Sequence, residues 1–139
     1  MSAKKDYERL ENALEQAMYA IRACIDECIA QLNVNDLTEE KMGACKKNAV
    51  ALMNHIRDAT RVIGSLLEQT KEERITSKLN GLTYFLDDMY QCVEPNTSTS
   101  LLSCLKAEDA SRGRLVLEKL KKDAAELSSL YEQLVEVLE

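Results

Sequence analysis

The chain is poor in aromatic and helix-breaking residues. It has no Trp, a single Phe at position 85, one Pro and four Gly in 139 residues. A core without large rings has to be built from Leu, Ile, Val, Ala, Met and Cys, and such cores suit helices packed against helices. Hydrophobic residues make up 45% and charged residues 30% of the chain. This composition predicts one folded domain over residues 1–139, neither disordered nor collagenous.

Histidine is nearly absent, which excludes several kinds of metal and acid–base chemistry. A ferritin-type di-iron bundle needs Glu-x-x-His pairs from two helices, but His55 is the only histidine and Leu52 stands three residues before it. Cys45 and His55 are ten residues apart, on different sides of one predicted helix, and no other histidine could act as the base for a nucleophilic Cys. Gly-rich phosphate loops are also absent. We therefore expect no catalytic residues, no cofactor and no metal, and the chain is not predicted to be an enzyme.

The chain also lacks long apolar runs and a secretory signal. No stretch approaches the ~18 apolar residues of a membrane span, and the charged start Met-Ser-Ala-Lys-Lys-Asp has no apolar signal region. Five cysteines, an odd number, favour reduced thiols. A soluble, cytoplasmic protein is the expectation.

Extended clusters of positive charge are missing as well, since the short ones at Lys46-Lys47 and at Lys119, Lys121 and Lys122 are interrupted or followed by acids. The net charge is −6 and the isoelectric point is about 5.0. Since affinity for phosphate backbones comes from clustered Lys and Arg, a nucleic-acid function is excluded. Solubility is the simplest reason for the acidic balance.

What the sequence does contain is a set of apolar stripes with steps of three and four residues, the period of an α-helix. The clearest stripe comprises Met42, Cys45, Ala49, Leu52, Ile56, Ala59, Ile63 and Leu66. Others lie in a first helix expected over 5–32, in a stripe from Ile75 to Val93, and in a last helix that begins at Leu101, falters near 109–113 and then continues to the C-terminus. Gly64, on the edge of the clearest stripe, predicts a close helix approach.

Residues 38–93 admit two interpretations. The stripe from Ile75 is out of phase with the stripe that ends at Leu66, so either the chain turns between them or one long helix absorbs a stutter. A turn, with Thr70 and Glu73 forming a capping box, is favoured. The predicted fold is therefore an all-α, antiparallel up-and-down four-helix bundle with a heptad-like aliphatic core. The alternative is a long central helix in a three-helix arrangement.

With no chemistry in view, the surface carries the functional hypothesis. Tyr7 and Tyr19 lie on the first helix, and Tyr84 and Phe85 fall beside the stripe that contains Met89. We expect an adaptor, scaffold or complex subunit that docks a partner's amphipathic helix in a groove between two of its own helices. The third helix, which carries the stripe from Ile75 to Val93, and the C-terminal helix are expected to line this groove. The expected anchors are Tyr84, Phe85, Met89 and Tyr131.

Two other functions stay open. The long stripes can pair between chains to make a structural homodimer. Cys24 and Cys28, one helical turn apart, can in principle hold a soft metal ion, although buried cysteines more often serve as small apolar residues. In length and in its Ala- and Leu-rich helices the chain resembles the small helical bundles of the talin, vinculin and focal-adhesion-targeting type, a resemblance without a shared motif that assigns no residue a role.

Overall fold

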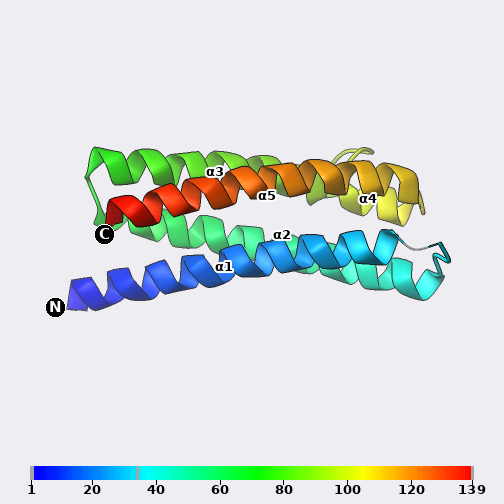
Figure 1. The fold of residues 1–139 in the computed structure, drawn as a ribbon, viewed down its shortest axis with the longest axis horizontal. Coiled ribbons are helices and arrows are strands. Elements are labelled where there is room, and N and C mark those ends of the chain that lie inside the picture. The colour runs from blue at the N-terminus through cyan, green and yellow to red at the C-terminus, as the bar shows by residue number, and fades with distance from the viewer. Residues whose placement is uncertain (1, 34, 139) are drawn as a thin grey trace.

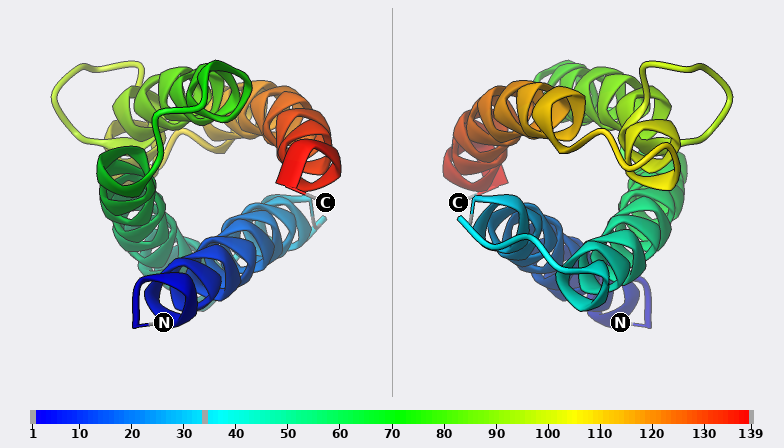
Figure 2. Two further views of the ribbon diagram at one scale, coloured as in Figure 1. Left: turned by 90° about the vertical axis from the view of Figure 1, so that its left-hand side faces the viewer. Right: turned by 90° about the vertical axis from the view of Figure 1, so that its right-hand side faces the viewer.

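The computed structural model is all-helical and describes residues 2–33 and 35–138. Its five helices are α1 (Ser2–Leu32), α2 (Glu39–Gln69), α3 (Glu73–Val93), α4 (Leu101–Lys106) and α5 (Ala110–Leu138), and no strand occurs in the described ranges. Figure 1 shows the four long helices lying lengthwise, with successive ones running in opposite directions. Viewed along their length, they surround a common core, and both chain ends lie at one end of the molecule (Figure 2).

The predicted stripes form this core. All eight residues of the stripe from Met42 to Leu66 are buried, and so are the six stripe residues between Ile75 and Val93. The stripes on α1 and α5 are mostly buried too. Each long helix thus hides one face and exposes a charged one. No helix in the described part of the chain is apolar over a length that crosses a membrane.

Residues 38–93 form two helices, so the favoured interpretation is confirmed. Thr38 caps α2, because its hydroxyl oxygen accepts a hydrogen bond from the Lys41 amide at 3.2 Å. The predicted Thr70–Glu73 capping box is wrong. Thr70 instead accepts from the Glu72 amide at 3.4 Å, and α3 begins at Glu73 without a side-chain cap.

The interruption in the last helix lies earlier than predicted. Glu108 has a left-handed backbone (φ 58°) and ends the helical path of α4. The Asp109 carboxylate then accepts a hydrogen bond from the Arg112 amide at 3.1 Å, which satisfies one free donor at the start of α5. Gly113 therefore lies inside α5 and not in the break.

The start of α5 is fastened to the end of α1. Arg114 donates from Nε and Nη2 to the Leu32 carbonyl oxygen at 2.9 and 2.6 Å. This carbonyl has no partner within its own helix, and a cation at a helix C-terminus also meets the negative end of the helix dipole. Gly113 permits the approach, since a Cβ there would lie 3.2 Å from Leu32 Cδ1.

Replacement by Ala should have opposite effects at exposed Gly64 and at buried Gly113. A Cβ at exposed Gly64 would meet nothing within 4 Å, so the predicted close approach is absent there. We expect Gly64→Ala to stabilise the protein by about 1 kcal/mol, because Ala favours the helix by that amount. Gly113→Ala should destabilise it by about 1 kcal/mol, since the cost of crowding the buried Leu32 side chain exceeds the helical gain. Urea denaturation measures both, and equal shifts in the same direction would contradict the assignment.

Candidate functional site

The four expected anchors do not share one groove. Tyr84 is 71% exposed on α3 and makes an edge-to-face contact with half-buried Phe85, with ring centroids 5.5 Å apart. Met89 is completely buried in the core, so it cannot serve as a surface anchor. Tyr131 lies on the side of α5 that faces α1, away from Tyr84 and Phe85. The groove expected between α3 and α5 is therefore not formed by these residues.

Two hollows instead follow the seam between α1 and α5. One, of about 250 Å³, is lined by Glu15, Met18, Tyr19 and Arg22 of α1 and by Ser128, Tyr131 and Glu132 of α5. The other, of about 150 Å³, lies toward the chain ends and is lined chiefly by Tyr7, Glu11, Leu14, Tyr131, Leu134, Val135 and Leu138. Tyr131 borders both hollows, and we call the two together the α1–α5 groove.

This groove opens where the stripe of α5 is incompletely covered. Leu117, Leu120 and Leu127 are buried as the helical period predicts, but Tyr131 and Leu138 on the same stripe are only half-buried. Figure 2 shows the reason: α1 and α5 diverge toward the end that holds both chain termini. Apolar side chains that the sequence pattern assigns to the core thus line an accessible seam.

The groove half of the seam between α1 and α5 also differs from the other seams in its hydrogen bonds. Three seams carry a side-chain link: Asn48 donates to Gln31 between α2 and α1, Arg57 to Tyr90 between α2 and α3, and Lys78 to Gln133 between α3 and α5. Between α1 and α5, the side-chain hydrogen bonds of the described residues come from Arg114 alone, at the far end. The groove half of this seam is held by apolar contact only.

The polar lining of the groove is mainly acidic. Burial, followed by the nearby charges of Glu15 and Glu11, raises the pKa of Tyr131 to about 12. Burial and the charges of Glu11 and Glu72 also raise the pKa of Tyr7. Both phenols are disfavoured as anions because the site already holds negative charge in partly desolvated surroundings. They therefore stay neutral and can donate a hydrogen bond at physiological pH.

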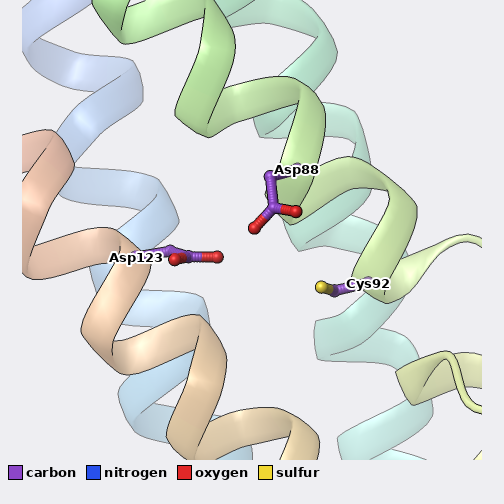
Figure 3. Close-up of side chains that lie close together, drawn as sticks. All are labelled: Asp88, Cys92 and Asp123. Atoms are coloured by element: carbon purple, nitrogen blue, oxygen red, sulfur yellow. The ribbon is translucent and has the colours of Figure 1, made fainter.

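A second polar cluster lies between α3 and α5, and sequence reasoning missed it. Asp88 and Cys92 of α3 approach Asp123 of α5, with one ligand atom of each within 4.8 Å of the others (Figure 3). Asp88 is half-buried. The spacing of Asp88 and Cys92 by one helical turn was available in the sequence, whereas their nearness to Asp123 depends on how the helices pack.

Among the described residues, these three side chains are the group that could hold a metal ion, but the ammonium group of Lys119 already lies among them. Its Nζ lies 2.7 Å from Asp88, 3.3 Å from Asp123 and 3.3 Å from Cys92 Sγ. Hydrogen bonds with Asp123 and Lys119 lower the pKa of Asp88, whereas burial and the contact with Asp88 raise the pKa of Asp123. The cluster fits a tethered ammonium that joins two helices.

The cysteines weighed as metal ligands lie in or beside the core. Cys28 and Cys45 are fully buried and face each other across α1 and α2, each thiol 3.6–3.9 Å from the other residue's carbonyl oxygen. The hydrogen bond with Cys45 and burial raise the pKa of the Cys28 thiol. Cys24 is half-buried. Their placement matches the use of Cys as a small apolar residue.

Replacement of Lys119 by Met should make stability depend on pH. At pH 7 the change leaves two neighbouring carboxylates without their cation, and we expect a loss of about 1 kcal/mol, as for a largely exposed pair. The low pKa of Asp88 gives the native ion pair a stabilising effect above about pH 4, which is lost as the pH falls through that pKa. The difference between variant and native protein should therefore shrink at pH 3. Urea denaturation at both pH values measures it.

Lys121→Met supplies the control for this prediction. Lys121 is exposed on the same helix, so the control removes an equal charge away from the cluster. An equal loss in the control, or a Lys119→Met loss of the same size at both pH values, would count against the ammonium link.

Comparisons with known proteins do not assign a function to the chain. No protein-family model, curated protein or solved structure matches the chain. What the protein does has to be inferred from its own geometry.

Proposed function

We propose that the chain is a non-enzymatic protein–protein interaction module that docks an amphipathic helix of a partner in the α1–α5 groove. The observation that carries this proposal is the incomplete burial of Tyr131 and Leu138, two stripe residues that the helical period assigns to the core. A partner's apolar stripe laid along this seam would cover the surface that α1 leaves exposed. Burial of apolar area is the general source of such affinity.

The proposal includes a bundle architecture. We infer that α1, α2, α3 and α5 make an antiparallel up-and-down four-helix bundle with heptad-like packing, and that α4 closes one end. Side-by-side helices with alternating directions and buried stripes support it. In such a bundle a fifth helix docks most easily where two neighbouring helices diverge, which is the feature that Figure 2 supports for α1 and α5.

The dimensions of the groove suit a short helix. Its lining on α1 extends from Tyr7 to Arg22, which at 1.5 Å per residue is about 22 Å. A docked helix of about fifteen residues, four turns, would match that length. Tyr19, 69% exposed at the edge, can contribute the aromatic contact that frequently dominates such interfaces.

Self-association through the long stripes is the less favoured function. The eight stripe residues of α2 are already buried within the chain, so pairing between chains through them would require the core to open. Sedimentation of the purified protein is a direct test of this alternative.

Selection of helical peptides tests the proposed function. An 18-residue library with randomised positions is displayed on phage and selected against the purified full chain. We expect enriched peptides to carry apolar residues at i, i+3, i+4 and i+7. By fluorescence anisotropy, Tyr19→Ala should weaken the best peptide at least tenfold, since an aromatic anchor is worth about 1.4 kcal/mol or more.

Tyr84→Ala is the matched control. It removes the same side chain with nearly the same exposure, 71% against 69%, from a position on α3 that does not line the groove. The affinity of the Tyr84→Ala variant for the best peptide should stay within about twofold of that of the native protein. Circular dichroism should show that both variants are folded. A peptide that is weakened by Tyr84→Ala and not by Tyr19→Ala would place the site on α3. Failure to enrich any helix would refute the function.

A further inference from the structure

The charged groups that line the α1–α5 groove are unbalanced. Glu11 and Glu15 project from α1 and Glu132 from α5, whereas Arg22 is the single basic residue of the lining, at one end. Glu15 and Glu132 border the larger hollow from opposite sides, together with Tyr131. An occupant of this groove would therefore have acidic side chains along both of its flanks.

These glutamates take part in none of the ion pairs that the structure describes. Among the described residues, no basic group lies within 4 Å of Glu11, Glu15 or Glu132. The neighbouring seam differs, because there Lys119 lies within 3.3 Å of both Asp88 and Asp123. Both seams of α5 thus contain carboxylates, but only the closed one supplies its own cation.

The negative charge is also felt inside the groove. The charges of Glu15 and Glu11 add to burial in raising the pKa of Tyr131. Burial and the charge of Glu8 raise the pKa of Glu11 itself. The Glu11 carboxylate is thus partly desolvated, so it attracts a cation brought beside it more strongly than a carboxylate at an open surface does, and exposed Glu15 and Glu132 add their charge.

We infer that the helix docked in the α1–α5 groove is a basic amphipathic helix, with Lys or Arg on both sides of its apolar stripe. This inference rests on the function proposed above and adds the chemistry of the partner. Lys and Arg suit the site because their aliphatic stems pack on apolar surface while the charged ends extend outward. Here the stems would lie against Met18 and Val135 and the charged ends would meet the glutamates.

Three peptides with one apolar stripe test the charge preference. The stripe is that of the best peptide selected from the library, and the flanking positions are all Lys, all Gln or all Glu. Anisotropy with the full chain should give an affinity roughly tenfold higher for the Lys peptide than for the Gln peptide, and the weakest binding for the Glu peptide. At 1 M salt, where the screening length is about 3 Å, the Lys advantage should disappear.

A matched pair of triple variants locates the effect. Glu11→Gln with Glu15→Gln and Glu132→Gln should lower the affinity of the Lys peptide to that of the Gln peptide. The control replaces three exposed glutamates outside the groove lining, Glu27, Glu68 and Glu118, by Gln and changes the net charge equally. The control should keep most of the preference. A loss of equal size in the two triple variants would overturn the inference, because overall charge would then explain it.

The outcomes separate the inference from the function on which it rests. If all three peptides bind equally and lose affinity with Tyr19→Ala, the groove binds helices without regard to charge, and only the inference fails. If no peptide binds, the proposed function fails as well. If sedimentation shows a dimer that Tyr19→Ala dissociates, a second copy of the chain occupies the groove, and the basic partner is overturned.

Discussion

The structure depends on the burial of apolar stripes without aromatic rings. The stripe of α2, from Met42 to Leu66, is buried along its whole length, and aliphatic side chains from the other helices surround it. Small residues such as Ala49 and Ala59 let the helices lie close together. The close packing of aliphatic groups then supplies the dispersion attraction that aromatic rings provide in other cores. Every other feature of the molecule is arranged around this requirement.

The four seams between the long helices satisfy it unequally. Arg114 fastens α5 to the end of α1, and Gly113 lets the two helices approach there. From that point α1 and α5 diverge, and Tyr131 and Leu138 are only partly covered, although Leu134 between them is buried. A chain that folds by burying stripes thus keeps a stretch of one stripe accessible, which is the physical basis of the proposed docking role.

Electrostatics follow the same division. Where α3 and α5 pack closely, Lys119 neutralises the carboxylates that face each other. Where α1 and α5 diverge, water can solvate the exposed Glu15 and Glu132, so no internal cation is needed beside them for the chain to fold. The proposed basic partner would do for the open seam what Lys119 does for the closed one.

The sequence by itself determined the helices and their inward faces, because a 3.6-residue period and local caps such as Thr38 act within a few residues of chain. Only the tertiary structure decided that Tyr131 faces α1 and that Lys119 meets Asp88 across 31 residues of chain. The bond from Arg114 to the Leu32 carbonyl spans 82 residues. Such contacts depend on how whole helices pack, and a local pattern carries no record of which neighbour a side chain will meet.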